Sequence, residues 1–558
     1  MLKLGLVTGL PLLAPRMAAT LGRPESSPRT TPFVSPLPIP PKAIQVAPFT
    51  PSPEAVAHLR DLGRGGIPPN TKYYQLIQEE ALVQLHPELP RTRVWRYRDV
   101  NAPPNNPFAP GPTFVVNHGD PQVVRQMNRL PANHVGFGET NTTVHLHGGH
   151  VLPLFDGFPA NVPELPVPVV ISPGQHFDYV YANQDVGFAN GAPDPDERAS
   201  MLWYHDHLLD QTGPNVYRGL AGVYNIFDKL DTGNETTGLR LPGPVGVFDI
   251  PLVLQDRRIA RDGSLVYLPE NFDGFLGDKS LVNGAINPFL RVQRRKYRFR
   301  VLNGSNSRFY LLSVTDRRGS RQRFDIIATE GGLLSQTLRD QQKFLVANAE
   351  RIEFVFDFSR YPAGTELFLT DFLRQENGRG PGGDFERPDQ VPANEANRIL
   401  KFVVGGGPVK DPSRVPDRLR PIRPVPQAKL DAAERRTFEF ERKGGRWAIN
   451  GQFVDLQRAL ASVARGRPQI WTLKNGGGGW WHPIHIHIDF MRVLERNGLA
   501  PGPLERDGMA KRDTVTLGPG DEVKVFIEFR DFTGLTVFHC HNIEHEDMFM
   551  MARLDIVK

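Results

Sequence analysis

From about residue 70 onward, the chain alternates apolar and polar residues in short runs bounded by Gly, Pro, Asn or Asp. A period of two places alternate side chains on opposite faces of a strand, as expected for strands that bury one face. Helical periodicity is weak and short, for instance around Tyr73–Ile77. The pattern therefore predicts an all-β protein. Seven runs show it clearly: Arg93–Tyr97, Thr113–Val116, Phe177–Tyr181, Tyr297–Leu302, Ile352–Phe356, Gln469–Leu473 and Glu522–Phe529.

Two weak internal repeats divide these runs into three similar units. A turn of the Pro-Gly type precedes a strand three times, near residues 173, 362 and 519. An apolar strand that ends in Asn-Gly occurs twice, at residues 283 and 450. Three units also suit the length, because one hydrophobic core rarely exceeds about 250–300 residues. We predict domains at 70–235, 240–405 and 425–558, with a linker rich in Gly, Pro and Arg at 406–424.

Residues 1–69 are expected to form an N-terminal extension and not a domain. Residues 22–53 are rich in Pro, Ser and Thr, which predicts an extended arm. Before them, Lys3 and the apolar run Leu4–Ala14 resemble a weak signal peptide that is too short to span a bilayer. This run supports an exported, periplasmic or cell-surface location as well as a cytoplasmic one. No other run is apolar for about 18 residues, so no integral membrane segment is expected.

The net charge of +5 is mild for 558 residues. Arginines are scattered except in Arg291–Arg300, where basic and apolar residues alternate. We interpret this segment as a strand with one solvated basic face. Because no nucleic-acid-binding motif accompanies it, we expect no nucleic-acid partner. The chain is expected to act as a monomer.

Histidines gather in four short segments. Random placement of 16 histidines among 558 positions gives fewer than one His-x-His pair on average, and this chain has four. Residues i and i+2 of a strand point to the same face, so each pair presents two imidazoles together. Imidazole is the commonest protein metal ligand and suits Cu, Zn, Fe and Ni. The pairs are His145/His147, His205/His207, His485/His487 and His539/His541, with His482 and His545 beside them.

The last segment narrows the choice of metal, because it contains the single cysteine of the chain, Cys540. One Cys thiolate, two His and a weak axial Met form the ligand set of a blue-copper electron-transfer site. Cys540 and His545 fit two of these positions, Met550 fits the axial one, and His482 is the candidate for the second His. Zinc with one Cys and several His stays open, but it does not explain why histidines flank the cysteine on both sides.

The flanking histidines predict a coupled pair of sites. If Cys540 binds one copper, then His539 and His541, on the opposite strand face, can bind a second centre. The peptide itself then connects the two. Reduction of O2 to water needs four electrons, which requires a cluster of this kind.

The histidine pairs stand in four longer motifs. These are HLHGG at His145–Gly149, LWYHDH at Leu202–His207, HPIHIH at His482–His487 and HCHNIEHEDMFMM at His539–Met551, joined by NVYRGLAGVY at Asn215–Tyr224. In this order they closely resemble the motifs of the multicopper oxidase family, and within it those of the bacterial spore-coat laccases. The resemblance covers the chain from about residue 40 to its end. It implies three cupredoxin-like Greek-key β-barrel domains and four copper ions per chain, one of type 1, one of type 2 and two of type 3.

The resemblance also implies a role for each ligand. It assigns His482, Cys540 and His545 to the type 1 copper, with Met550 as axial ligand; His145 and His485 to the type 2 copper; and His147, His205, His207, His487, His539 and His541 to the type 3 pair. Met548 and Met551 are the other axial candidates, and the ten-residue spacing from Cys540 favours Met550.

Two carboxylates, Glu546 and Asp156, match acids of the spore-coat laccases. They are candidates for delivering the protons that O2 reduction consumes. Asp206, between two ligands, alternates to the opposite strand face and is expected to be structural. His150, close to the first motif, is a candidate for supporting the ligands from behind. Ordinary surface or loop positions are expected for His58, His86, His118, His134 and His176.

Three functions are weighed. The first is a laccase-like oxidase that takes single electrons from phenolic or aromatic donors and reduces O2 to water. The second is a bilirubin oxidase-type enzyme or a metallo-oxidase acting on Mn(II), Fe(II) or Cu(I); only nine methionines and no Met-rich insert disfavour Cu(I). The third is a copper-binding coat protein without turnover, which the complete ligand set disfavours. A two-domain nitrite reductase is disfavoured because that family lacks the type 3 pair.

Overall fold

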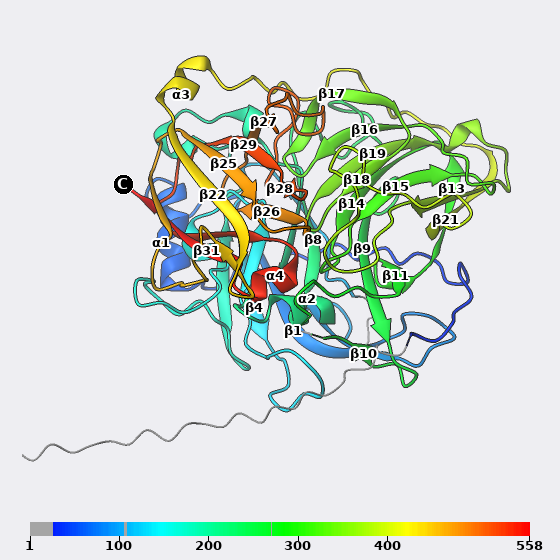
Figure 1. The fold of residues 1–558 in the computed structure, drawn as a ribbon, viewed down its shortest axis with the longest axis horizontal. Helices are drawn as coiled ribbons and strands as arrows, with labels where there is room; N and C mark the ends of the chain where they lie inside the picture. Colours follow the sequence, from blue (N-terminus) through cyan, green and yellow to red (C-terminus); the bar gives the residue numbers. More distant parts are fainter. Residues whose placement is uncertain (1–25, 105–108, 269–270) are drawn as a thin grey trace, which may run out of the picture.

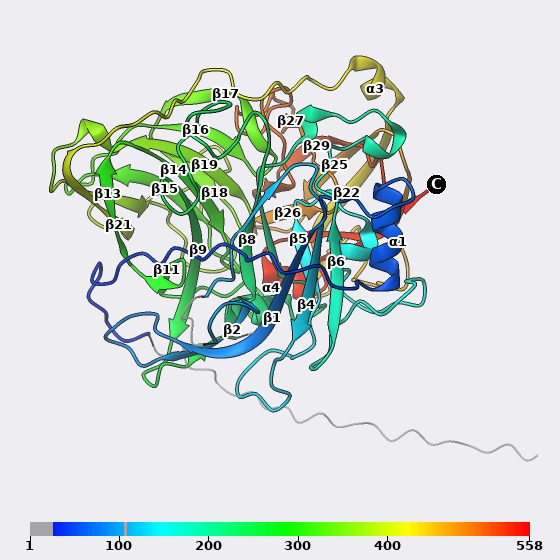
Figure 2. The same cartoon turned by 180° about the vertical axis from the view of Figure 1, so that it is seen from behind.

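The computed structural model describes residues 26–104, 109–268 and 271–558, and its strands form three successive pairs of β-sheets. Figure 1 shows the second pair in green beside the yellow-to-red third pair, and Figure 2 shows the blue-to-cyan first pair from behind. Each of the seven runs predicted from the alternation overlaps a strand. The run that resembles a signal peptide lies outside the described residues.

The first sheet pair spans residues 72–227 and packs one hydrophobic core between its sheets. Residues Tyr73–Ile77 lie within strand β1, so the weak helical periodicity was misleading there; β1 pairs with β2 and β4. The sheet β2-β1-β4-β6 consists of β1 (Lys72–Val83), β2 (Thr92–Asp99), β4 (Gln122–Asn128) and β6 (His176–Tyr181). The sheet β3-β8-β7-β5 consists of β3 (Phe114–Asn117), β5 (Val144–His147), β7 (Met201–Asp206) and β8 (Ala221–Phe227).

The second sheet pair spans residues 249–408 and encloses a core rich in Phe, Leu and Ile. Its larger sheet, β12-β11-β9-β14-β19-β16-β17 with β10 beside β9, consists of β9 (Asp249–Ile259), β10 (Leu265–Val266), β11 (Lys279–Val282), β12 (Ala285–Ile286), β14 (Lys296–Asn303), β16 (Phe324–Thr329), β17 (Gly332–Gln341) and β19 (Arg351–Asp357). Its smaller sheet, β13-β21-β20-β15-β18, consists of β13 (Phe289–Arg294), β15 (Tyr310–Thr315), β18 (Phe344–Val346), β20 (Glu366–Asp371) and β21 (Asn397–Pro408).

The third sheet pair spans residues 434–557, and its core contains the side chain of Cys540. The sheet β23-β22-β25-β29-β27 consists of β22 (Glu434–Lys443), β23 (Arg446–Ile449), β25 (Gln469–Asn475), β27 (Arg492–Arg496) and β29 (Glu522–Ile527). The sheet β24-β31-β30-β26-β28 consists of β24 (Ala461–Ala464), β26 (His482–Ile486), β28 (Thr514–Leu517), β30 (Gly534–Cys540) and β31 (Met551–Val557).

Short helices connect the sheet pairs. Helix α1 (Pro53–Leu62) packs on β6, and α3 (Gln427–Ala432) precedes the third pair. Helices α2 (Thr212–Arg218) and α4 (Ile543–Asp547) lie side by side, as Figure 1 shows. The Asp547 carboxylate accepts hydrogen bonds from the first amides of α2, which joins the first and third sheet pairs. Within the described residues, no helix has the length and apolar character needed to cross a membrane.

The Pro-rich arm lies along the first two sheet pairs as extended chain. Leu37 donates its amide to Phe289 O at 2.7 Å, and Thr113 donates to Pro41 O at 2.7 Å. The arm and α1 cover two histidines that were expected at the surface. His86 is 1% exposed and its ring lies 3.0 Å from Thr31 O. His58 is 6% exposed, and burial lowers its pKa to about 4. The prediction of a surface or loop position is therefore wrong for His58, which is buried on α1, whereas His86 lies in a loop, although a buried one.

The basic segment Arg291–Arg300 spans two strands, and only its first part, on β13, has the predicted solvated face, with Arg291 exposed. Its second part, on β14, does not. Arg298 and Arg300 on β14 are both 0% exposed. Arg298 binds Asp231 through two hydrogen bonds of 2.8 and 3.0 Å, and Arg300 binds Asp249 through two of 2.7 and 2.8 Å. Carboxylates on neighbouring elements compensate the buried guanidinium groups. The alternation in the sequence shows that these arginines share one face of a strand, but it does not show what covers that face.

Candidate metal centre

The four His-x-His segments lie on two pairs of neighbouring strands. In the first sheet pair, His145 on β5 stands opposite His205 on β7. In the third, His485 on β26 stands opposite His539 on β30. Because residues two apart share a strand face, each pair of strands presents its imidazoles on one side. The two sets of rings face each other across the junction of the sheet pairs.

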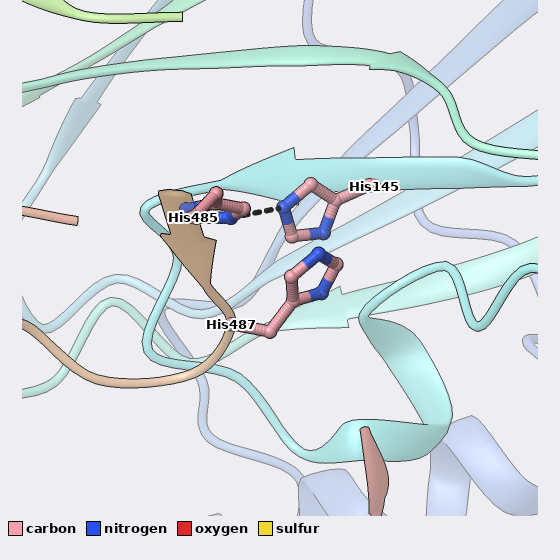
Figure 3. A group of neighbouring side chains, drawn as sticks. All are labelled: His145, His485 and His487. Carbon is pink, nitrogen blue, oxygen red and sulfur yellow. Dashed lines mark hydrogen bonds between the residues drawn. The ribbon is translucent and has the colours of Figure 1, made fainter. Parts of the chain in front are cut away.

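Eight imidazoles meet at this junction, and we call them the histidine octet. Each ring is at most 1% exposed. His145 Nε2 lies 3.3 Å from His485 Nε2, and Figure 3 shows these nitrogens pointing at each other with the His487 ring beside them. His539 Nε2 lies 3.1 Å from His207 Nε2 and 3.2 Å from His487 Nε2. The octet consists of His145, His147, His205, His207, His485, His487, His539 and His541.

The other side of the octet consists of the rings of His147, His205 and His541. The ring centre of His541 lies 5.0 Å from that of His147 and 5.5 Å from that of His205. The octet therefore contains a pair, His145 with His485, flanked by two sets of three rings. Such an arrangement can hold several metal ions in contact with one small ligand.

A second, separate group contains His482, Cys540 and His545, which we call the Cys540 trio. Cys540 Sγ lies 3.5 Å from His482 Nδ1 and 3.7 Å from His545 Nδ1, and the two nitrogens are 3.2 Å apart. All three residues are 0% exposed. Three donor atoms at these separations can bind one metal ion.

Of the three candidate axial residues, Met550 has the closest ties to the trio. Cys540 donates its amide to Met550 O at 3.1 Å, and Met550 donates its amide to His545 O at 2.9 Å. Met550 and Cys540 belong to the same hydrophobic cluster, which Met548 touches from a half-buried position. Met551 belongs to a different cluster, beside Phe158. The side chain of Met551 therefore lies on the side of β31 that is turned away from the trio.

Burial shifts the pKa values of these ligands in the direction that favours their uncharged forms. It lowers the pKa of His482 to about 3, and burial together with His539 lowers the pKa of His541 to about 3. Both rings are therefore neutral at physiological pH, which is the form that binds metals. Burial raises the pKa of the Cys540 thiol well above its ordinary value, so the thiolate needs a bound cation.

Several buried ring nitrogens have no hydrogen-bond partner among the described residues. They include His147 Nε2, His205 Nε2 and both nitrogens of His541. An unsatisfied buried polar group costs about 1–3 kcal/mol. A bound metal ion removes that cost. The thiolate, the imidazoles and the thioether are soft or borderline donors, so these residues fit copper.

Comparison with known proteins agrees with this donor set. Family models described as multicopper oxidase match residues 103–231 and 421–558. A bilirubin oxidase of Albifimbria verrucaria is 35% identical over 489 residues, which cover 86% of this chain and 76% of that protein. A laccase of Bacillus subtilis is 32% identical over 537 residues, 87% of this chain and 94% of the laccase. The chain belongs to the multicopper oxidase family.

Solved multicopper oxidases share its fold. The McoA multicopper oxidase of Aquifex aeolicus has a TM-score of 0.70 at 26% identity, over 87% of this chain and 96% of that one. The enzyme of Pediococcus acidilactici has a TM-score of 0.72 at 25% identity, over 96% and 93%. The predicted all-β fold of three cupredoxin-like domains is confirmed. This multicopper oxidase is a copper-dependent oxidoreductase with O2 as acceptor; the Cys540 trio matches a type 1 site and the octet a trinuclear copper site.

Backbone carbonyls orient the rings of this multicopper oxidase. His145 Nδ1 donates to Asp156 O, His205 Nδ1 to Asp206 O and His485 Nδ1 to Asp513 O, each at 2.7 Å. A proton held on Nδ1 leaves Nε2 unprotonated and facing the octet, where it can bind metal. The sequence motifs mark Asp206 but give no sign of Asp513, which follows a loop far from any histidine pair.

The two carboxylates predicted to deliver protons both touch the octet. Asp156 Oδ2 lies 2.7 Å from His487 Nδ1, and burial raises the pKa of Asp156 despite the nearby His145. Glu546 Oε2 lies 3.0 Å from His539 Nδ1, and Glu546 is 0% exposed. Asp206 turns away and accepts hydrogen bonds from Thr143 N and from Asn215 Nδ2, at 3.0 and 2.9 Å.

An arginine from the second sheet pair reaches the octet, although that pair contributes none of its histidines. Arg351 on β19 is 0% exposed and binds the Asp513 carboxylate through two hydrogen bonds of 3.0 and 2.6 Å. Its Nη1 also lies 3.1 Å from His147 Nδ1. Since Asp513 orients His485, Arg351 holds two members of the octet in place. No sequence motif pointed to this residue.

Arg351→Met is expected to weaken copper binding at the octet and to lower O2 reduction by about 10–100-fold, the range seen when groups behind metal ligands are removed. Arg300→Met is the matched control, because Arg300 is equally buried and paired but contacts no histidine. Each variant removes the hydrogen-bonded guanidinium partner of a buried carboxylate, at a cost of about 3–5 kcal/mol in stability. Copper per chain and the blue absorption are measured. Equal copper loss in both variants would show that Arg351 is only structural.

His150 supports the fold and not the ligands. Its Nδ1 lies 2.8 Å from Asp489 Oδ1, and its Nε2 lies 2.8 Å from Asp531 Oδ2. Burial lowers the pKa of His150, but the two carboxylates outweigh burial and raise it to about 10. The imidazolium therefore clamps the first sheet pair to the third.

The His150 clamp makes stability depend on pH. Its folded pKa of about 10 exceeds the ordinary 6.5, so its contribution is complete below about pH 6.5 and is lost as pH rises through about 10. At about pH 6, we expect the free energy of unfolding of wild type to exceed that of His150→Gln by on the order of 4 kcal/mol, so wild type should unfold at a higher temperature. This difference between the two proteins should become smaller near pH 10. Thermal unfolding of both proteins checks this. If the difference in unfolding temperature became larger toward pH 10, the proposed role of His150 would be wrong.

Proposed function

We propose that this multicopper oxidase is a laccase of the spore-coat type, which takes single electrons from phenolic and aromatic donors. The observation that carries the proposal is strand β30, where Cys540 of the trio stands between His539 and His541 of the octet. The two groups are thus directly adjacent along the chain. The 32% identity to the Bacillus subtilis laccase supports the subgroup.

In this proposal, His482, Cys540 and His545 hold the type 1 copper, with Met550 as axial ligand. His145 and His485, whose Nε2 atoms are 3.3 Å apart, hold the type 2 copper. His207, His487 and His539 hold one type 3 copper, and the other belongs to His147, His205 and His541. Copper, when bound, supplies one-electron oxidation at the trio and four-electron reduction of O2 at the octet. Four donors and four protons are then consumed for each O2 reduced to two waters.

The chain supplies orientation, protons and exclusion of water. The carbonyls of Asp156, Asp206 and Asp513 fix ring tautomers, and the buried octet keeps bulk water away from the reacting oxygen. We assign Glu546 and Asp156 to proton delivery, because each places a carboxylate within 3.0 Å of an octet ring. A carboxylate in that place can hold a proton and pass it toward the octet.

Glu546→Gln tests the proton role. The amide keeps the size and a hydrogen bond to His539 but cannot carry a proton. We expect O2 reduction to slow by about 10²-fold, the usual contribution of general acid catalysis. The slowing is expected to grow as pH rises, because bulk protons become scarcer, while donor oxidation stays unchanged. Steady-state O2 consumption against pH is the measurement. If the pH profile of Glu546→Gln is the same as that of wild type, Glu546 does not deliver protons.

The decisive experiment is an absorption spectrum of the copper-loaded protein with copper counted per chain. We expect an intense band at about 600 nm, a shoulder at about 330 nm and four coppers. A colourless protein with one copper or none would overturn the proposal.

Bilirubin oxidation is the second candidate. The 35% identity to the bilirubin oxidase of Albifimbria verrucaria favours it. Comparing kcat/KM for bilirubin with that for simple phenols separates the two.

A further inference from the structure

Helix α1 of the N-terminal extension packs against the first sheet pair. It lies beside β6, as Figure 2 shows. Ser52, directly before the helix, donates its amide to the Asp178 carboxylate on β6 at 2.8 Å, which fixes the start of α1. The buried side chains of α1 share one face of the helix; they are Ala55, His58 and Leu59.

The His58 ring lies between two phenyl rings. Its centre is 5.5 Å from that of Phe155, with the two planes 29° apart, and 5.9 Å from that of Phe532. We call these three residues the His58 stack. Each of them is at most 6% exposed, and His58 Nε2 has no hydrogen-bond partner among the described residues. The imidazole therefore serves as an apolar packing group, which requires its uncharged form.

The His58 stack is joined directly to a residue that contacts the octet. Phe155 ends the short 3-10 helix η1 (Pro153–Phe155), and Asp156 follows it. The Asp156 carbonyl accepts a hydrogen bond from His145 Nδ1 at 2.7 Å, and its carboxylate lies 2.7 Å from His487 Nδ1. A side chain of the N-terminal extension thus contacts the residue next to Asp156.

The chain after Asp156 is packed directly on β5. Gly157 has a φ of +78°, and a Cβ on it would lie 2.4 Å from Val144 O. Only a glycine allows this close approach of the two backbones. Because the chain is fixed at Gly157, the position of Phe155 determines where the Asp156 side chain points. The His58 stack fixes the position of Phe155.

His58 is uncharged at neutral pH. Burial lowers its pKa from 6.5 to about 4, although the Asp61 carboxylate acts in the opposite direction. Asp61 lies three residues later on α1 and is exposed, and Glu54 lies four residues earlier and is half-buried. The carboxylates of α1 therefore compensate only part of the cost of placing a charge in the His58 stack.

The carboxylates on the other elements around the His58 stack have partners of their own. On β6, Asp178 is bound by Arg125 through two hydrogen bonds of 2.7 and 2.8 Å. On the loop before β30, Asp531 lies 2.8 Å from His150 Nε2. After η1, Asp156 is engaged by the octet. A proton on the buried imidazole therefore costs more than these groups return.

We propose that α1 positions Asp156 at the octet through the His58 stack, and that the stack separates in acid. This inference rests on the proposed function, which gives Asp156 a part in O2 reduction. His58 is a positioning residue, because it acts through Phe155 and touches no ring of the octet. When His58 takes up a proton, its imidazolium leaves the apolar contact, and Phe155 no longer holds Asp156 against His145 and His487.

The direction and size of the acid effect follow from His58. Its pKa is about 4 while the stack is closed and 6.5, the ordinary value, once the stack has separated. The closed stack binds fewer protons, so acid favours separation. The equilibrium constant for separation should rise tenfold per pH unit as pH falls from 6.5 to about 4, or about 300-fold in all.

Hydrogen exchange of the copper-loaded full chain, read by mass spectrometry and corrected for the intrinsic effect of pH, measures the separation. In wild type, residues 53–62 and 153–158 should lose protection together between pH 6.5 and pH 4, by up to about 300-fold. His58→Phe keeps an aromatic ring beside Phe155 but cannot take up a proton, so the protection of both segments should stay constant. His58→Leu, with a smaller side chain, should give the same result.

His176→Phe is the matched control for the exchange experiment, because His176 is an exposed histidine on β6. It should lose protection in acid as wild type does. The inference is overturned if wild type keeps its protection at pH 4, or if both His58 variants lose it as wild type does. It is also overturned if residues 53–62 lose protection and residues 153–158 do not.

A double-mutant cycle at pH 7 tests whether His58 acts through Asp156. His58→Ala removes the ring and should slow O2 reduction about tenfold, and Asp156→Asn should slow it about 10²-fold. The loss in the double variant should be smaller than the product of the two single losses, because both changes affect the same contact. His86→Ala is the control: His86 is equally buried but holds Thr31, so O2 reduction should not change in either background.

A wild-type rate in His58→Ala, or a double variant whose loss equals the product, would show that α1 does not act through Asp156. The two experiments also separate this inference from the proposed function. If Asp156→Asn alone reduces O2 at the wild-type rate, the role assigned to Asp156 in proton delivery fails. The exchange of residues 153–158 then still decides whether α1 holds Asp156 in place.

Discussion

Cys540→Ser is expected to abolish the blue colour and to lower O2 consumption at least about a thousandfold, equivalent to about 4 kcal/mol of activation free energy. The serine hydroxyl is a hard, neutral donor that does not replace a thiolate at copper. Cys540 is also the residue through which β30 joins His539 and His541 to the trio, so both sites depend on it. Serine is close in size, and the core around this position should stay packed.

The measurements are absorption at about 600 nm, copper per chain and O2 consumption, with the unfolding temperature as a check on the fold. Thr536→Ser, a small change on the same buried strand, is the matched control and should leave the colour and the activity unchanged. A blue and active Cys540→Ser would refute the assignment of the trio.

His485→Ala is expected to separate the two sites. His482 lies three residues earlier on β26 and belongs to the trio, so the blue band should remain. O2 reduction should fall at least about hundredfold, because removing a ligand costs no less than removing a group behind it. His485 Nε2 lies 3.3 Å from His145 Nε2, and its Nδ1 is fixed on Asp513 O. An aromatic donor should bleach the blue band, and readmitted O2 should fail to restore it.

His176→Ala is the control for this variant, because His176 is an exposed histidine on β6 and contacts no member of the octet. It should bleach and recover like wild type. If His485→Ala consumes O2 at the wild-type rate, the assignment of the octet is wrong.

Predictions from local spacing were the most successful. The period of two placed each His-x-His pair on one strand face. Strand β5 carries both histidines of its pair, and β7, β26 and β30 each carry the first histidine, with the second directly after the strand end. The same rule failed to place Arg298 and Arg300 correctly, because it defines the face of a side chain and not its surroundings. Carboxylates from Asp231 and Asp249 cover that face. His58 was misplaced for the same reason.

The residues that hold the ligands were harder to find. Asp513 and Arg351 lie in segments without a motif, and their roles come from contacts across 162 positions of sequence between the second and third sheet pairs. His150 lies next to the first motif, yet it binds Asp489 and Asp531 of the third sheet pair and points away from the octet. Neighbourhood in sequence was a poor guide for this residue.

By itself, the sequence determined the fold class of this protein and the histidine pairs and Cys540 that can bind metal. These follow from residue types and short spacings, which act over a few residues of one strand. The assignment of each residue to one copper stays a prediction from the resemblance to multicopper oxidases. The tertiary structure alone decided which histidines meet and which arginine supports them. Such contacts join residues hundreds of positions apart. They depend on how whole sheets pack, and the pattern of a single strand carries no information about the surface that it meets.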